Sequence, residues 1–404
     1  MARRNSRLYL IGLGVSLLGS GAMSLVAGVW VRSLTGSSAA AGLVSACVYA
    51  PSLLGPVAGL IADRLDRRRL LVAVNLLSGV ITLSLLAVRS RGDVWVIYLV
   101  MASYGAQLAL SGPAESGLFA ELLPLPQRLR VNGLRLGLQE TARVVAPLIG
   151  AGLFTVVGGS GVAALDALTF LIAAWLTAML RFRSQPRARA GAASGRELLA
   201  GFAHVRSVPL LRAVAIAAAA AMALSGVVVA AQYSLVSALG QRPAFLGVLA
   251  AGLGVGSVVA ALSAARVQRR IGERGLVLAG LCNYALGSAL YATATIPTAL
   301  LGSLVLGFAL PWIFLAALNA AQRLTPQELQ GRVSAALTLM LFGPLAPLQA
   351  LGAWAITQTG FRSLYLGAAF TAGLLALAFA RLGLGAPDAQ RPQRRSGERP
   401  RAGG

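Results

Sequence analysis

The stretch GLIADRLDRRRLL, residues 59–71, carries six charged side chains between two long runs that carry almost none. It belongs to a chain of 404 residues, of which 57% are hydrophobic and only 12% are charged. Soluble domains usually contain about 25% charged residues. This composition leaves too little polar surface to cover a water-soluble globule, so we expect a membrane protein.

Apolar runs long enough to cross the ~30 Å hydrocarbon core recur along the chain. Twelve such runs start near residues 8, 39, 70, 94, 132, 161, 208, 243, 275, 296, 333 and 363. We expect helices, because a helix satisfies its backbone polar groups within one segment, whereas a β-barrel would need alternating segments of about ten residues. The first run is longer than the ~7–15 apolar residues of a secretion signal, so we expect it to be retained. The sequence thus predicts an all-α membrane protein with twelve transmembrane helices.

The basic residues, all 35 of them arginines, are unevenly distributed between alternate loops. If the N-terminus is cytoplasmic, the inner segments hold 29 arginines and the outer loops hold five, which are Arg32, Arg89, Arg91, Arg242 and Arg362. This bias follows the positive-inside rule and predicts a multi-pass protein of the cell membrane with both termini in the cytoplasm. A nucleic-acid surface would gather the charge in one domain or stripe, so the net charge of +23 does not indicate nucleic-acid binding.

The residues that usually build metal sites and catalytic triads are scarce. Cys47 and Cys282 both lie within apolar runs, and His204, the single histidine, lies in a basic loop. The chain contains no lysine, which excludes an ATP-binding loop of the G-x-x-x-x-G-K-[ST] type. We therefore expect neither an enzyme nor a bound metal or organic cofactor.

The segment RFRSQPRARAGAASGREL, residues 181–198, is rich in Arg, Gly, Ala and Ser and predicts a flexible linker between two halves. At an offset of 202 residues, six residues near span junctions match identical ones: Arg64, Arg67, Arg68, Pro124, Arg130 and Val131 fall on Arg266, Arg269, Arg270, Pro326, Arg332 and Val333. Such matches indicate two related halves. We expect six-helix bundles at 1–180 and 207–383, a cytoplasmic linker at 181–206 and a disordered basic tail at 384–404.

The opening stretch resembles motif A of the major facilitator superfamily, which lies between the second and third of twelve spans. The residues that fill the motif are Gly59, Asp63, Arg64, Arg67 and Arg68. Asp66 stands where many members have Gly, and Ala265 stands where the second half would repeat the acid. The resemblance implies a gate in which the acid contacts the other half near Arg332. Alternatively, the arginines only set the topology and the two aspartates balance their charge.

Four further segments are similar to the branch that includes enterobactin and macrolide exporters: PAESGLFAELLP (113–124), APLIGAG (146–152), LDALTFLIAA (165–174) and LTPQELQGRV (324–333). This resemblance implies a monomeric secondary transporter in the lipid bilayer that exports a small amphipathic molecule by alternating access. Antiport against a proton gradient would supply the energy. A nutrient importer of the same fold, or a membrane sensor or scaffold that does not transport, remain alternatives.

Charged side chains inside the apolar runs are functional candidates, because each costs at least ~2.5 kcal/mol near a helix centre. Glu140 and Arg143 lie three residues apart on one face of the fifth span, where they either form a structural pair or take part in proton coupling. Asp166 near the start of the sixth span either caps that helix or carries the proton. Many members of the branch have an acid after Leu-Gly in the first span, where this chain has Ser20.

Uncharged polar side chains in the spans could line a central substrate cavity or join helices by hydrogen bonds. The candidates are Ser20, Gln107, Gln232, Asn319 and Gln349. Because the spans contain few acids and one arginine, we expect a neutral or anionic substrate rather than a strictly cationic one.

Overall fold

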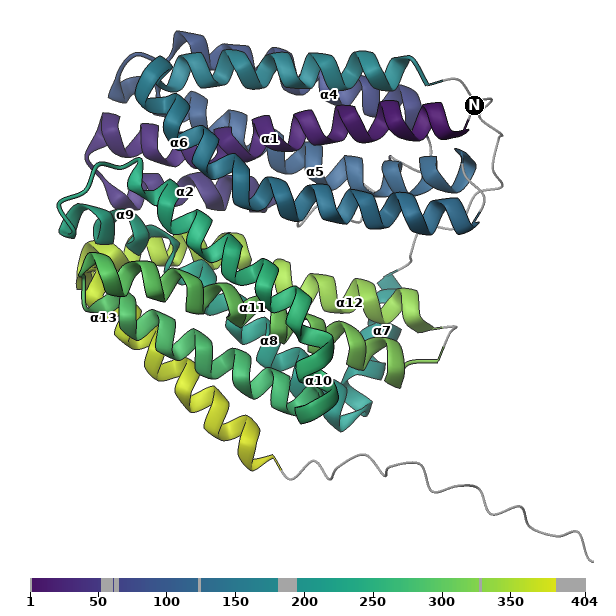
Figure 1. Ribbon diagram of the computed structural model, residues 1–404, viewed down its shortest axis with the longest axis vertical. Helices are drawn as coiled ribbons and strands as arrows, with labels where there is room; N and C mark the ends of the chain where they lie inside the picture. Colours follow the sequence, from purple (N-terminus) through teal and green to yellow (C-terminus); the bar gives the residue numbers. More distant parts are fainter. Residues whose placement is uncertain are drawn as a thin grey trace, which may run out of the picture.

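The computed structural model describes residues 2–51, 61, 65–122, 125–180, 195–326 and 329–382. These residues form helices joined by short turns, and no β-strand occurs among them (Figure 1). The predicted all-α membrane fold is therefore confirmed.

The first half contains α1 (Ala2–Thr35), α2 (Ser38–Tyr49), α4 (Arg67–Leu83), the short 3-10 helices η2 (Ser84–Ala87) and η3 (Arg91–Asp93), α5 (Val94–Leu122) and α6 (Leu125–Ala178). The second half contains α7 (Gly195–Ser207), α8 (Pro209–Val227), α9 (Val229–Ala238), α10 (Phe245–Ala292), α11 (Ile296–Leu324), α12 (Gln330–Phe342) and α13 (Leu345–Arg381). In Figure 1 the two halves form separate bundles that lie one above the other.

Within the described residues, nine helices are long and apolar enough to cross a membrane. Two of them contain a glycine at which the chain reverses, Gly158 (φ 67°) in α6 and Gly360 (φ 76°) in α13. These φ values lie in the left-handed region, which glycine adopts without a Cβ clash. Dividing these two helices at their glycines, and adding the shorter apolar helix Ser38–Tyr49, is consistent with the twelve predicted spans. The two glycines are 202 residues apart, so the turns share the offset of the sequence repeat.

Successive spans run in opposite directions, so their connections lie on two faces. The terminal face carries the start of α1, Asp66 at the start of α4, Gly272, Thr325 and the end of α13. The opposite face carries Gly36, Ser90, Gly158, Arg242 and Gly360.

The two halves meet near the opposite face. The Arg32 Nη2 atom donates to Ser237 Oγ at 3.1 Å, and Ser234 Oγ donates to Ser38 Oγ at 2.7 Å. In Figure 1, α2 and α9 lie side by side at this end, and the bundles spread apart toward the terminal face. The structure thus has its halves closed against each other at the opposite face.

The described part of the predicted linker is helical. Helix α7 covers residues 195–207 and buries Val205 in the core of the second half. A Cβ built on Gly201 would overlap the carbonyl of Arg332, so α7 packs directly against the start of α12. Residues 181–194 and the predicted tail at 384–404 lie outside the described residues.

Candidate functional site

Asp166 lies inside the second part of α6, eight residues after the turn at Gly158, and only 1% of its surface is exposed. At the ~1.5 Å rise of an α-helix it is about 12 Å from that turn. The interpretation of Asp166 as a helix cap is therefore wrong. The sixth span begins earlier than its apolar run suggested, since Gly158 alone makes the turn and the helix resumes at once.

Hydroxyl groups of α5 and α6 bind the Asp166 carboxyl, and a third hydroxyl, from α4, extends the cluster. Tyr104 of α5 donates from its hydroxyl to Asp166 Oδ2, and Thr169 Oγ1 shares its hydrogen between the Asp166 carbonyl at 2.8 Å and Asp166 Oδ1 at 3.0 Å. The Tyr104 hydroxyl also lies 3.1 Å from Thr82 Oγ1 of α4, which donates to the carbonyl of Ser78 at 2.7 Å. The structure describes no ion pair to Asp166, so its described partners are neutral.

This chain of groups can accept a proton without losing a hydrogen bond. When Asp166 is ionised, Tyr104 donates its single hydroxyl hydrogen to the carboxylate. A hydrogen bond between Thr82 and Tyr104 then requires Thr82 to donate to the Tyr104 oxygen and to lose its bond to the Ser78 carbonyl. When Asp166 is protonated, its own O–H can donate to Tyr104, Tyr104 to Thr82 and Thr82 to the Ser78 carbonyl. The site is thus suited to bind a proton and to release it when the neighbouring helices move.

Helix α1 closes this cluster from a fourth side through Gly19. A Cβ built on Gly19 would overlap both Asp166 Oδ1 and Thr169 Oγ1. Ser20, the next residue, donates its Oγ hydrogen to the carbonyl of Ser16 at 2.8 Å. The carboxyl of α6 therefore lies beside the Leu-Gly segment of the first span.

The second half has no carboxyl at the equivalent position. The residue 202 positions after Asp166 is Ala368, which is buried. Tyrosines dominate the neighbouring core: the Tyr291 hydroxyl lies 2.8 Å from Ser303 Oγ, and the rings of Tyr291 and Tyr365 make an edge contact at 5.1 Å. The protonatable group described here is thus a feature of the first half.

The predicted motif A gate is only partly described. Gly59, Asp63 and Arg64 lie outside the described residues. Arg67 is the first residue of α4, and Arg68 Nη1 donates to the carbonyl of Leu180 at 2.8 Å, just beyond the end of α6.

Asp66, which replaces the usual Gly of the motif, has a local structural role. Its side chain accepts a hydrogen bond from the backbone N–H of Arg69 at 2.8 Å and so caps the N-terminus of α4. An aspartate is among the preferred residues at this position because it satisfies a free backbone donor and faces the positive end of the helix dipole.

Glu140 and Arg143 both lie in α6. The side chain of Glu140 is outside the described residues, and the Arg143 side chain is exposed and has an interaction partner. Their predicted pairing therefore stays a prediction.

The five predicted cavity residues are not gathered around one described cavity. Asn319 Nδ2 donates to Gln268 Oε1 at 2.7 Å, which joins α11 to α10 within the second half and supports the interhelical alternative. Gln349 is buried in α13, and its Oε1 has no hydrogen-bond partner within the described ranges. Gln107 in α5 and Gln232 in α9 are half-buried, as is Ser20.

A buried ion pair near the terminal face was not predicted from the sequence. Glu115 of α5 is 8% exposed, and its Oε2 accepts from Arg135 Nη1 of α6 at 2.8 Å. Tyr9 of α1 also hydrogen-bonds the Glu115 carboxyl. Burial raises the pKa of Glu115, while Tyr9 and Arg135 act against that rise. Its position directly after an apolar run was the available signal.

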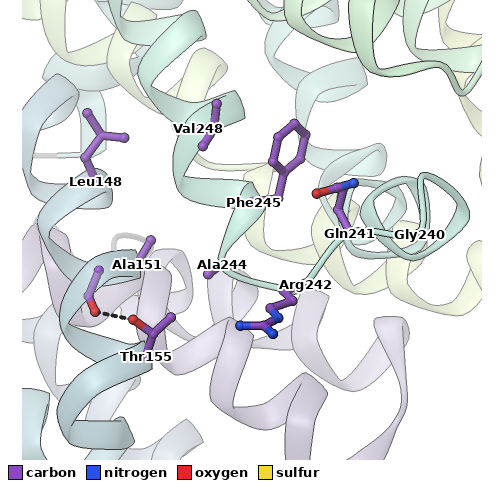
Figure 2. Close-up of a pocket in the computed structure, with 10 residues that line it drawn as sticks. Leu148, Ala151, Thr155, Gly240, Gln241, Arg242, Ala244, Phe245 and Val248 are labelled. Atoms are coloured by element: carbon purple, nitrogen blue, oxygen red, sulfur yellow. Dashed lines mark hydrogen bonds between the residues drawn. The ribbon is translucent and has the colours of Figure 1, made fainter.

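A groove of about 530 Å³ lies at the opposite face between α6 and the turn that joins α9 to α10 (Figure 2). Leu148, Phe245 and Val248 give it apolar walls, and the side chain of Arg242 extends from the turn toward α6. The Arg242 guanidinium makes no hydrogen bond or ion pair with any residue that the structure describes, while its backbone carbonyl accepts from the N–H of Phe245. An apolar groove with one available cation suits a neutral or anionic amphiphile.

Comparisons with known proteins agree with this architecture. A family model described as "Transmembrane secretion effector" matches residues 7–399. Macrolide efflux protein A of Streptococcus pyogenes is 25% identical over 173 residues, which are 42% of this chain and 43% of that protein. The match thus spans less than half the length of this relative.

Solved structures of transporters share the fold. The nucleoside transporter NupG superposes with a TM-score of 0.74 at 14% identity, covering 93% of this chain and 98% of that one. A bacterial homologue of the human lysosomal transporter Spinster, in an inward-facing and occupied conformation, superposes with a TM-score of 0.68 at 12% identity, covering 93% and 95%.

Proposed function

We propose, because the chain belongs to the transmembrane secretion effector family of the major facilitator superfamily, that it exports a small amphipathic molecule in exchange for protons. The observation that carries the proposal is the buried carboxyl of Asp166, held by the hydroxyls of Tyr104 and Thr169 with no described cation beside it. Ionisable groups inside a membrane protein are expensive and mark proton pathways in transporters.

The position of Asp166 supports its role as the proton carrier. It lies against Gly19 of the Leu-Gly segment, where many members of the exporter branch place an acid on the first span and this chain has Ser20. A carboxyl supplied by α6 can serve the same region. Glu140 is a second candidate, on the fifth span.

Alternating access would proceed by rocking of the two halves. The contacts Arg32–Ser237 and Ser38–Ser234 hold the opposite face shut, and in the proposed topology this face is external and the terminal face is cytoplasmic. Opening the opposite face would break these two hydrogen bonds, release the substrate and expose Asp166 to external protons. Return to the present state would then deliver the proton inward.

The substrate class rests on the relative and on the groove. A macrolide efflux protein is similar over part of the chain, and the groove beside Arg242 combines apolar walls with one cation. We therefore propose an organic molecule with a large apolar surface, such as an antibiotic, a siderophore or a related metabolite.

Transport direction is tested with inside-out membrane vesicles from cells that express the protein, loaded with acid and supplied with a labelled macrolide. Export by proton antiport predicts accumulation that collapses when a protonophore is added. Accumulation only in right-side-out vesicles would instead assign the protein to import. A screen of antibiotics and siderophores for ligands that raise the unfolding temperature would identify the substrate.

A further inference from the structure

Helix α5 presents a continuous polar stripe on one of its faces. Tyr104, Gln107, Ser111 and Glu115 are spaced at i, i+3, i+7 and i+11, so at about 100° per residue they fall within an arc of roughly 80°. At a rise of ~1.5 Å per residue, the stripe runs about 16 Å from Tyr104 to Glu115. One end touches Asp166 and the other lies near the terminal face.

Ser111, in the middle of this stripe, is buried, and its Oγ has no hydrogen-bond partner among the residues that the structure describes. Serines in helices commonly donate to the carbonyl one turn earlier, as Ser20 does in α1. A buried hydroxyl without such a bond is costly, and it is available to a proton carrier such as a water molecule.

Helix α1 runs alongside the stripe: it contacts Glu115 at one end and, at the other end, Asp166, the partner of Tyr104. Tyr9 hydrogen-bonds Glu115, and ten residues further along α1 Gly19 lies against Asp166. Ser16 lies between these two positions and is also buried. The two carboxyls are therefore joined by two helices that both carry polar or small residues between them.

Glu115 is built to hold either charge state. Among the described residues, the titratable groups that face it are Tyr9 of α1 and Arg135 of α6. Arg135 Nη1 pairs with the carboxylate, while the buried Arg135 Nε has no partner in the described part of the chain. Burial raises the pKa of Glu115, which favours proton uptake, and the arginine stabilises the carboxylate once the proton has left.

We propose that Glu115 is the inner proton-exchange group of the transporter and that the α5 stripe relays protons between it and Asp166. The proposal rests on the proposed proton antiport. Asp166 gives up its proton and becomes a carboxylate, and the Glu115 carboxylate accepts that proton and then releases it to water at the terminal face. Successive side chains of the stripe are about 4.5–6 Å apart along the helix axis, which is longer than one hydrogen bond. Water molecules beside Gln107 and Ser111 therefore carry the proton between the side chains.

The relay is tested with Glu115→Gln and Ser111→Ala in proteoliposomes. Glutamine keeps an oxygen for Arg135 and Tyr9 but cannot exchange a proton, and Ser111→Thr restores the hydroxyl. The matched control is Ser103→Ala, because Ser103 lies on α5 one residue from Tyr104, off the stripe, and donates to the carbonyl of Val100. Two rates are measured for each variant: substrate transport driven by a pH gradient, and substrate counterflow, which requires no net proton transfer.

The relay predicts that Glu115→Gln and Ser111→Ala slow gradient-driven transport by at least about tenfold and leave counterflow within about twofold of wild type. The Ser111→Thr and Ser103→Ala variants should retain both rates. Wild-type gradient-driven transport in Glu115→Gln and Ser111→Ala would overturn the relay, and so would a parallel loss of counterflow, which indicates a structural role. If the wild-type protein itself ignores the pH gradient, the proposed antiport fails as well.

Discussion

Gly19 and Asp166 are in direct contact across the α1–α6 interface: the missing side chain of the glycine makes the space that the carboxyl occupies. The contact joins the first and sixth spans at the candidate proton site. Because Thr169 Oγ1 shares the same space, a single methyl group at position 19 would press on the whole cluster.

Gly19→Ala should therefore impair coupling more than stability. The new methyl displaces the Asp166 and Thr169 side chains and weakens the bond from Tyr104, at a cost of about 1–3 kcal/mol for overpacking. We expect gradient-driven transport to fall strongly while the protein still folds and inserts. Gly14→Ala is the control, because a Cβ there would make only ordinary contact with Leu138. Equal transport by the two variants would contradict the assigned role of this contact.

The Ser38–Ser234 contact gives a direct test of alternating access, since the two Oγ atoms lie 2.7 Å apart across the halves. After Cys47 and Cys282 are replaced by serine, Ser38→Cys with Ser234→Cys should form a disulfide under oxidation. We expect this bond to stop transport and a reductant to restore it. Undiminished transport by the fully cross-linked protein would show that this face does not open.

Two arginines bind backbone carbonyls at or just beyond the ends of α6 and α13. Arg68 donates to Leu180, and Arg274 donates to Ala380 and Leu382 at 2.6 and 2.5 Å. Arg68→Ala should lower stability by about 1–2 kcal/mol in thermal unfolding in detergent, because a charged donor to a free helix carbonyl is lost. Arg274→Ala should cost less, since that contact is exposed. Arg69→Ala, whose side chain is exposed, serves as the control, and a loss of the same size there would contradict the carbonyl contact as the cause.

The pH dependence of stability should report on Glu115. Its pKa in the folded protein lies above the ordinary value of 4.5, so the stability it contributes is complete below about pH 4.5 and is lost as pH rises through the folded pKa. Glutamine cannot ionise, so the unfolding temperature of Glu115→Gln relative to wild type should increase with pH over this range. A difference that stays constant with pH would show that Glu115 has the same pKa folded and unfolded.

Much of the fold could be predicted from the sequence because the bilayer imposes simple rules. Apolar runs of about 20 residues and the alternation of arginines locate the spans. The repeat offset of 202 also separates Gly158 from Gly360, whose positive φ values make the corresponding turns of the two halves. The positions of these two turns are harder to predict from the sequence, because a single glycine is enough to make each turn and the hydropathy barely changes across it.

The candidate site was less accessible to sequence reasoning because its contacts are not local. Asp166 was singled out by its charge, but its partners Tyr104 and Gly19 are 62 and 147 residues away and carry no signal of their own. Glu115 lies within a segment that is similar to a family pattern, so its charge does not stand out as a separate signal. Its pairing with Arg135 and Tyr9 depends on how three helices pack, which periodicity does not specify.

The most direct test of the account is proton release by purified protein in response to substrate. In detergent without buffer, a pH indicator should record proton release when the substrate binds to the wild-type protein, and Asp166→Asn should bind substrate but release none. Asp93→Asn, which removes a carboxylate on the opposite face that is bonded to Ser90, should behave as wild type. Proton release by Asp166→Asn equal to that of wild type would contradict the assignment of Asp166 as the proton carrier.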